Sequence, residues 1–323
     1  MIKLSVIIPT RNRSKLLQNT IASIVHQTFP KEEFEVIVID NGSNDNTKDV
    51  VMSFSSVLPN LQYHYDDTPG LHVGRHNGYK FAKSDILVYA DDDIEAFPSW
   101  LEAIYDSFSD ADVMLVGGKD LPKYEQKPPF WIEELWYKAD KEGHSLGALS
   151  IVDLGNEIKE ISPYYVYGCN YSVRKSLITE TKGFHPDGVP FDIIELRGDG
   201  EWYVNKFIVE NGYKVIYNPK ASVFHIVTKD RLSLDYFKRR SFRRGVESSY
   251  AHKRYGIKKK SFIKRLLSSV FSNLNRMYKA CVMTDIEKEI NKSFEIGYNY
   301  HDMMYKNNSA LREWVHKDNY LDA

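Results

Sequence analysis

The sequence predicts an α/β fold in which a mostly parallel, Rossmann-like sheet is flanked by helices, with a helical appendage at the C-terminus. Strand patterns alternate with helical patterns over residues 1–118, and a basic run followed by a helical pattern ends the chain. Strand, helix, strand, repeated, builds a doubly wound sheet with right-handed crossovers. Ligands of such sheets bind at the carboxyl ends of the strands, so we expect the functional residues there.

Five strands are expected in the first part of the chain. Short β-branched or aromatic runs are typical of strands buried on both faces of a parallel sheet, and they occur at 4–8, 36–39, 61–65, 86–90 and 113–116. The first helix is indicated by apolar residues at helical spacing, namely Leu16, Leu17, Ile21, Ile24 and Val25. We expect Ser14 and Asn46 to cap the helices that follow them.

The periodicity weakens after this region. Residues 119–168 contain Pro122, Pro128 and Pro129 and are interpreted as a long loop or lid, the kind of segment that often carries function. Beyond it, we expect a strand at 164–173, a helix at 201–210, and strands near 214–217 and 221–225.

Composition excludes several classes of protein. The 323 residues predict about two domains, and 42% hydrophobic with 27% charged residues excludes disorder as the main state. Two cysteines, Cys169 and Cys281, cannot form a disulfide framework or a cysteine-rich metal site. The apolar stretch 4–9 is too short for a signal peptide, and no run approaches the roughly 20 apolar residues of a spanning helix. We therefore expect a cytoplasmic protein.

The net charge of -1 hides an asymmetry. Residues 229–265 hold fourteen Lys or Arg against three acids, a local net charge of +11, which leaves about -12 for the rest. The pattern 262–282 is amphipathic, so we divide the chain into an α/β domain at 1–228 and a helical basic region at 229–323. A solvated helical surface is the default interpretation. Peripheral contact of 236–282 with the inner face of the membrane is the alternative, whereas nucleic acid is not expected because an aromatic-interleaved motif is missing.

Three carboxylates follow the strand at 86–90. If the chain stays extended, Asp91 and Asp93 point to the same face about 6 to 7 Å apart. Adjacent carboxylates such as these and Asp92 repel each other, and folding tolerates them in water or around a hard divalent cation such as Mg²⁺ or Mn²⁺. A solvated acidic turn without function is the alternative interpretation, but the position directly after an apolar strand favours a metal site.

Two further polar groups follow neighbouring strands. Asp40, Asn41 and Ser43 end the strand at 36–39 and can hydrogen-bond a base edge or a ribose hydroxyl, although the same residues are ordinary turn formers. The first strand is closed by a loop that begins with Pro9, Thr10 and Arg11.

These segments together resemble a known family. SVIIPTRNR (5–13), VIVIDNGSNDNT (36–47) and GLHVGRHNGYKFAKSDILVYADDD (70–93) resemble the N-terminal half of the inverting family 2 glycosyltransferases with the GT-A fold. GCNYSVRK (168–175), GF (183–184) and RGDGEWYVNKFIVENGYKVIYNPKASVFH (197–225) resemble the acceptor-side half. The resemblance covers residues 3–228 and leaves the helical tail outside.

The resemblance implies a metal site. Asp91 and Asp93 match the DxD motif, in which the first carboxylate contacts the ribose and the last coordinates a Mn²⁺ or Mg²⁺ ion that bridges the nucleotide diphosphate; Asp92 lies between them. His225 matches a position that ligates the metal or touches phosphate in some GT-A enzymes, and a structural histidine is the alternative.

The resemblance also implies a donor site. Arg75 matches a basic residue that approaches the diphosphate or the donor sugar, and Asn77 a polar position beside it. The loop at Pro9, Thr10 and Arg11 matches the segment that packs against the base, next to Asp40. Asn41 stands where many members carry a second Asp that bonds uracil, so dTDP and GDP donors stay open beside UDP.

For the general base, the resemblance implies Asp199, which matches the acid of the ED motif and would take the proton of the acceptor hydroxyl. Gly198 stands where Glu is usual, so Glu201 is kept as an alternative base, or as an acid that merely favours a helix N-terminus.

Trp131 is the aromatic residue expected to stack on a sugar.

The function that follows is a metal-dependent inverting transferase that moves a sugar from a nucleotide diphosphate donor to a hydroxyl of a glycan or lipid-linked acceptor. The family's common roles imply bacterial surface polysaccharide synthesis. A noncatalytic nucleotide-sugar binding subunit is one alternative, a nucleic-acid-binding protein acting through the basic tail is another, and the oligomeric state, including a homo-oligomer, stays open.

Overall fold

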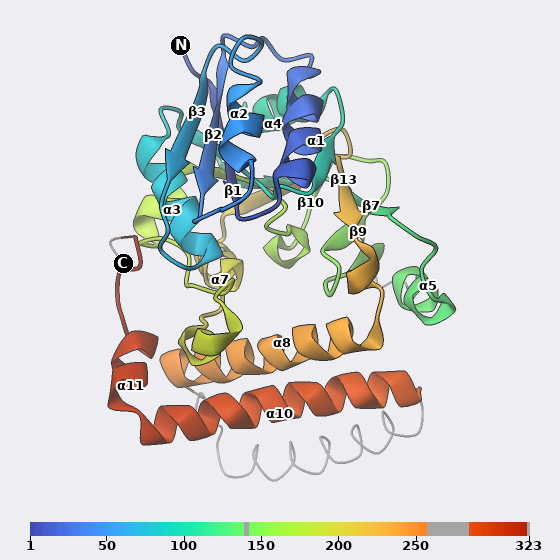
Figure 1. The fold of residues 1–323 in the computed structure, drawn as a ribbon, viewed down its shortest axis with the longest axis vertical. Coiled ribbons are helices and arrows are strands. Elements are labelled where there is room, and N and C mark those ends of the chain that lie inside the picture. The colour runs from blue at the N-terminus through green and yellow to red at the C-terminus, as the bar shows by residue number, and fades with distance from the viewer. Residues whose placement is uncertain (139–141, 257–283, 322–323) are drawn as a thin grey trace. The chain divides into compact units, whose positions relative to one another are not determined.

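The computed structural model describes residues 1–138, 142–256 and 284–321, shown as a coloured ribbon in Figure 1. The chain divides into two compact units. The first comprises Met1–Pro190, Gly200–Leu232 and Asp318–Ala323, and the second comprises Phe191–Asp199 and Ser233–Lys317.

The first unit contains an eight-stranded sheet with the strand order β10-β12-β6-β11-β4-β1-β2-β3. The strands β1, β2, β3 and β4 form parallel pairs, as do β6 and β12, whereas β11 runs antiparallel to β4 and β6, and β10 to β12. Their bounds are β1 Leu4–Thr10, β2 Phe34–Asp40, β3 Leu61–Tyr65, β4 Ile86–Ala90, β6 Val113–Gly117, β10 Lys159–Glu160, β11 Asn170–Arg174 and β12 Lys214–Tyr217.

A second sheet of five strands has the order β5-β13-β7-β9-β8. Only β13 and β7 pair in parallel. The strands are β5 Ile94–Ala96, β7 Asp120–Tyr124, β8 His144–Leu146, β9 Ile151–Asp153 and β13 Val223–Val227. Because β5 follows β4 after a three-residue turn, the acidic triplet links the two sheets.

Helices of the first unit connect and cover these strands. They are α1 Ser14–Val25, α2 Thr47–Met52, α3 Leu71–Phe81, α4 Trp100–Ser107, α5 Phe130–Tyr137, α6 Lys175–Glu180 and α7 Glu201–Asn211, with short 3₁₀ turns η1 Pro163–Tyr165 and η3 Lys229–Arg231. In β1, Leu4, Val6 and Ile8 belong to one apolar cluster and Ile7 to another, as the two-residue period of a strand requires. The main sheet is therefore buried on both faces, as its apolar strand runs predicted.

Three local predictions differ from the structure. Residues 119–168 are not one loop, because they contain β7, α5, β8, β9, β10 and η1. β8, β9 and β10 are too short to show a period, and β7 is fixed by its distant partner β13. The strand expected at 164–173 begins only at Asn170, after η1. Neither Ser14 nor Asn46 caps through its side chain; instead Asp45 accepts a 3.1 Å hydrogen bond from the backbone N–H of Thr47.

The second unit is helical. It consists of η2 Phe191–Leu196, α8 Leu234–Tyr255, α10 Asp285–Asn307 and α11 Ser309–Val315. Figure 1 shows α8 and α10 side by side, and glycines permit their close approach: a Cβ on Gly245 would lie 2.1 Å from the carbonyl oxygen of Phe294. The N-terminus of α10 is closed by a capping box between Thr284 and Glu287.

Much of the predicted amphipathic pattern at 262–282 lies outside the described residues. Within the part of the chain that the structure describes, the helices are all too short or too polar to span a membrane.

Candidate active site

The carboxyl ends of three neighbouring parallel strands define the site. In the register of β1 and β2, Thr10 pairs with Asp40, and β4 lies on the other side of β1 and ends at Ala90. The acidic triplet therefore starts at the sheet edge where the strand pattern predicted ligand contacts.

The three carboxylates have different surroundings. The chain turns at 91–93 instead of staying extended, so the alternation expected for a strand does not apply. The side chain of Asp91 is 29% exposed, whereas Asp92 and Asp93 are buried. The hydroxyl of Thr10 donates to Asp92 at 2.7 Å. Asp92 is thus held inside the fold, and Asp91 is the carboxylate that solvent reaches.

Asp91 and Asp93 meet His225, the three residues predicted to hold a metal. Their ligand atoms all lie within 4.8 Å of one another. Strand β13 brings His225 there, because it pairs with β5 so that His225 faces Ile94. The Nδ1–H of His225 donates to the carbonyl of Leu149 at 2.9 Å, which leaves Nε2 as an acceptor. Nε2 accepts from Arg231 at 3.2 Å and lies 3.3 Å from Oδ1 of Asp93.

Two arginines neutralise the buried acids of this cluster. Arg13 donates to both Asp92 and Asp93, and Arg231 donates to Oδ2 of Asp93 at 2.7 Å. Burial would raise the pKa of Asp93, but His225, Arg13 and Arg231 together hold it well below its usual range. Burial and the charge of Asp93 raise the pKa of Asp92 to about 7 in spite of Arg13.

The cluster fits a hard divalent cation in its donor set. Two carboxylates and an imidazole offer ligand atoms to one point, and carboxylate oxygen and imidazole nitrogen suit Mn²⁺. Asp93 Oδ1 is buried and accepts no hydrogen bond among the described residues, so one ligand oxygen is unused.

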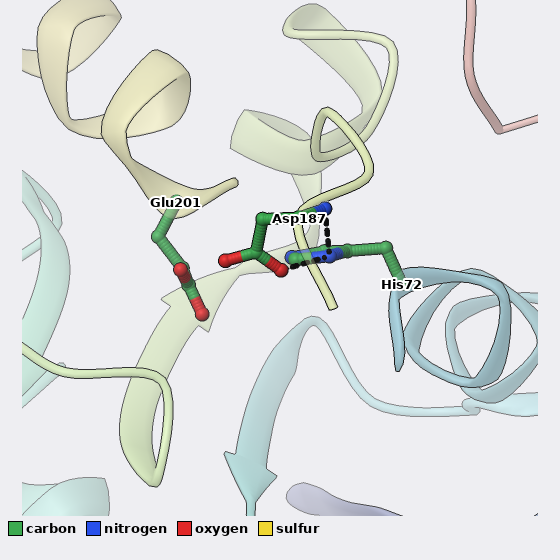
Figure 2. Close-up of side chains that lie close together, drawn as sticks. All are labelled: His72, Asp187 and Glu201. Carbon is green, nitrogen blue, oxygen red and sulfur yellow. Dashed lines mark hydrogen bonds and ion pairs between the residues drawn. The ribbon is translucent and has the colours of Figure 1, made fainter. Parts of the chain in front are cut away.

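A second cluster lies in the same unit, and one of its residues, Glu201, was predicted as the alternative base. Figure 2 shows Asp187 between His72 and Glu201, and the ligand atoms of these three residues also lie within 4.8 Å of one another. His72 Nδ1 is 2.8 Å from Oδ1 of Asp187. Glu201 comes from the first turn of α7, whereas His72 comes from the first turn of α3.

Arg75 joins the two clusters. It is 1% exposed, and its guanidinium donates to Glu201, to Asp91 at 3.3 Å and to the carbonyl of Gly168 at 3.0 Å. Gly168 provides the space, because a Cβ there would lie 2.4 Å from Nη2 of Arg75. Burial lowers the pKa of Arg75, but the carboxylates around it more than offset this and raise it. A permanently charged guanidinium thus fills the position between the clusters.

The two candidate bases belong to different compact units. Asp199 is part of the second unit, is 5% exposed and accepts a 3.0 Å hydrogen bond from the hydroxyl of Tyr255. Glu201 is part of the first unit and pairs with Arg75. Between them, Gly200 adopts φ +57°, and a Cβ there would lie 2.4 Å from the carboxylate of Asp187.

The residues predicted to bind the nucleotide lie around the ends of β1 and β2. Asp40 accepts from Ser43 N and from the Tyr63 hydroxyl, both at 2.8 Å. Asn41 is buried, and its Nδ2 has no partner among the described residues. Pro9 borders Gly74 of α3, and Arg11 is exposed.

Asn77 lies elsewhere in this region. It donates to Asp66. The side-chain NH₂ of Asn41 therefore has no partner among the described residues at this edge, whereas the NH₂ of Asn77 is hydrogen-bonded to Asp66 in the loop after β3.

Comparison with known proteins identifies the family. Residues 5–178 match the family model described as Glycosyl transferase family 2. The chain belongs to this family. It is a glycosyltransferase enzyme, as its sequence motifs predicted.

Two relatives from Haloferax volcanii are similar to this glycosyltransferase. Glycosyltransferase AglE is 36% identical over 115 residues, which are 35% of this chain and 38% of AglE, so the chain spans well under half of that relative. A glucosyl-dolichyl phosphate glucuronosyltransferase is 24% identical over 249 residues, 75% of each chain.

Among solved structures, a mannosyltransferase from Pyrobaculum calidifontis in complex with GDP-Man and Mn²⁺ has a TM-score of 0.55 at 16% identity. The match covers 97% of this chain and 84% of the mannosyltransferase. The fold is therefore the predicted GT-A fold with C-terminal helices.

Several residues around the acidic clusters of this glycosyltransferase were missed from the sequence. Arg13 and His72 lie inside the segments that carry the family resemblance, and Asp187 follows shortly after Gly183 and Phe184. Arg231 comes six residues after His225. All four are near recognised motifs, but their pairing with acids far along the chain left no local signal.

Trp131, the predicted sugar-stacking residue, lies on α5 and is half-buried.

Proposed function

We propose that this glycosyltransferase moves one sugar from a nucleoside diphosphate donor to a hydroxyl of a glycan or lipid-linked acceptor, with a divalent metal ion and with inversion, in surface polysaccharide assembly. The observation that carries the proposal is the convergence of Asp91, Asp93 and His225 at the carboxyl edge of the sheet. Two similar proteins add support. The mannosyltransferase from Pyrobaculum calidifontis was solved in complex with GDP-Man and Mn²⁺, and the glucuronosyltransferase from Haloferax volcanii is named for a glucosyl-dolichyl phosphate.

Asp91, Asp93 and His225 would hold the metal. A divalent ion there neutralises the negative charge that develops on a diphosphate leaving group. Arg13 and Arg231 keep Asp93 ionised, because their charges favour its carboxylate form. The chain therefore keeps a ligand oxygen unprotonated in a buried position.

The edge formed by Pro9, Thr10 and Arg11 on one side and Asp40 and Asn41 on the other is proposed to receive the nucleoside. The amide of Asn41 can both donate to and accept from a base edge, and its Nδ2 is unused. This leaves UDP, dTDP and GDP as candidate nucleotides. Asn77 would act indirectly, by fixing Asp66.

The general base is proposed to be Asp199, with Glu201 as the alternative. In an inverting displacement the acceptor oxygen attacks the anomeric carbon as its proton passes to a carboxylate, and the donor oxygen leaves with the diphosphate. Asp199 matches the family motif, and its Oδ2 accepts a hydrogen bond from the hydroxyl of Tyr255. Glu201 is already engaged in an ion pair with Arg75.

Calorimetric binding of UDP, dTDP and GDP, each with and without Mn²⁺, tests the proposal. Binding of one nucleotide that requires Mn²⁺ would support the metal site and name the donor class. Absence of binding by all three would remove the DxD assignment.

We also propose that the basic helix α8 lets the enzyme contact the inner face of the membrane, which sedimentation with anionic vesicles would test.

A further inference from the structure

Helix α8 carries two guanidinium groups that have no acidic partner in the described part of the chain. Arg240 and Arg243 are half-buried, and the buried Nε of each has no hydrogen-bond partner among the described residues. Neither side chain forms an ion pair within that part of the chain. Of the three segments outside it, 257–283 contains no Asp or Glu in its sequence, whereas 139–141 and 322–323 contain one Asp each.

The carboxylate closest along the helix is already engaged. Glu247, one turn beyond Arg243, accepts hydrogen bonds from both Nε and a terminal nitrogen of Arg197, with Nε at 2.8 Å. The side chain of Arg197 is 4% exposed, so this pair is buried on the arginine side. Glu247 is therefore paired with Arg197, and no ion pair joins it to Arg240 or Arg243 among the described residues.

The remaining positive charges crowd one another. Burial, followed by the charges of Arg197 and Arg240, lowers the pKa of Arg243. Like charges held together out of water are unfavourable unless an anion joins them. Paired guanidinium groups match the geometry of phosphate oxygens, to which they donate in parallel.

We propose that Arg240 and Arg243 form a binding site for a phosphate group of the acceptor substrate. This rests on the proposed function, because a lipid-linked acceptor carries phosphate next to its sugar. The donor diphosphate is assigned to the metal site of the first unit, whereas these arginines belong to the second. Arg239 and Arg244, exposed on the same helix, add positive potential that attracts an anion.

The test measures binding of inorganic pyrophosphate by calorimetry in EDTA, so that no metal site contributes. Arg243→Gln and Arg240→Gln are compared with Arg244→Gln, which removes the same charge from an exposed neighbouring position. We expect each of the first two substitutions to weaken pyrophosphate binding at least about tenfold, the effect of losing a charged hydrogen bond. Arg244→Gln should change it less than about threefold, as for an exposed charge.

Folding is checked in parallel. Because Arg243 is crowded by like charges, Arg243→Gln should unfold at a temperature no lower than the unaltered protein. If it does unfold earlier, Arg240→Gln carries the binding test. An equal loss in Arg244→Gln, or no pyrophosphate binding by the unaltered protein, would overturn the proposal, since diffuse surface charge would then suffice.

A second arm identifies the source of the phosphate. Phosphatidylcholine vesicles with and without phosphatidic acid are added as competitors of pyrophosphate. Competition that needs phosphatidic acid supports a site that takes phosphate at a membrane surface, and lack of competition supports the same site for a water-soluble acceptor. Nucleotide binding in Mn²⁺, measured on the same samples, should be unchanged in Arg243→Gln. Failure of nucleotide binding in every sample would remove the proposed function and leave the pyrophosphate result standing.

Discussion

Arg75 and Glu201, 126 residues apart in the sequence, form an ion pair in which the arginine is almost completely buried. The same guanidinium reaches Asp91 of the proposed metal site. A single cation from α3 therefore fixes two carboxylates that belong to separate clusters. Arg75 was predicted to approach the donor phosphates, and its contacts favour a second role, the positioning of these acids.

Substitution of Arg75 separates these roles. Arg75→Lys keeps the charge but loses the planar fork that serves Glu201, Asp91 and the Gly168 carbonyl together. We expect it to lower the free energy of unfolding by about 1 to 3 kcal/mol, and Arg75→Gln by roughly 3 kcal/mol because two carboxylates lose their partner. Urea denaturation measures both. Unchanged stability with weakened nucleotide binding would instead support direct contact with the donor.

Loss of the charge on Asp93 should remove the effect of the metal. Asp93→Asn is expected to abolish the increase in nucleotide affinity that Mn²⁺ causes, because it removes an anionic ligand and leaves Arg13 and Arg231 without their shared partner. Calorimetry with and without Mn²⁺ measures this. Asp112→Asn, at an exposed carboxylate, serves as the control. Equal Mn²⁺ dependence in both variants would contradict the metal site.

The two candidate bases can be told apart by two measurements. Asp199→Asn should lower the transfer rate by about 10²- to 10⁴-fold while nucleotide binding stays nearly intact. Glu201→Gln should mainly lower stability, since Arg75 loses a buried partner. Single-turnover transfer and urea denaturation are measured on both variants. If Asp199→Asn transfers sugar normally, Glu201 becomes the base.

Gly200 offers a test of how strictly the chain between the candidate bases is fixed. Gly200 and Gly212 both have positive φ, +57° and +66°, but an added Cβ meets Asp187 at Gly200 and nothing within 4 Å at Gly212. Gly212→Ala should cost about 1 kcal/mol from backbone strain alone. Gly200→Ala should cost more and reduce transfer, because Asp187 must move. If Gly200→Ala and Gly212→Ala lowered stability and transfer by the same amounts, Gly200 would not be tightly packed against Asp187.

Stability should fall in acid because of His76. Burial, with help from nearby His72, lowers the pKa of His76 to about 3, and its Nε2 accepts a 3.0 Å hydrogen bond from Phe184 N. The unfolded chain, with an ordinary pKa near 6.5, binds a proton first as the pH falls. The stabilisation is therefore complete above about pH 6.5 and is lost progressively toward pH 3. Urea denaturation at several pH values in this range gives the free energy of unfolding as a function of pH. In His76→Gln this free energy should fall less steeply with decreasing pH than in the unaltered protein, and an identical dependence on pH would refute the assignment.

Local sequence was enough to predict the main sheet. The strand 61–65 was placed with its observed limits, and the helix at 201–210 differs by one residue. Apolar runs and helical spacing report such elements directly, because their periods are set by the backbone. The short strands of residues 119–168 were missed, since β7 and its neighbours are defined by pairing with distant partners.

The sequence by itself determined the fold class and the family, which follow from local strand patterns and motifs. The family resemblance also predicted that Asp91 and Asp93 hold a metal, with His225 as a third candidate ligand. Only the tertiary structure decided that Arg75 is an internal partner of two acids, that Arg13 and Arg231 hold Asp93, and that Arg240 and Arg243 form no ion pair within residues 1–138, 142–256 and 284–321. Such relationships depend on which side chains meet after the chain has folded, and no period along the sequence encodes them.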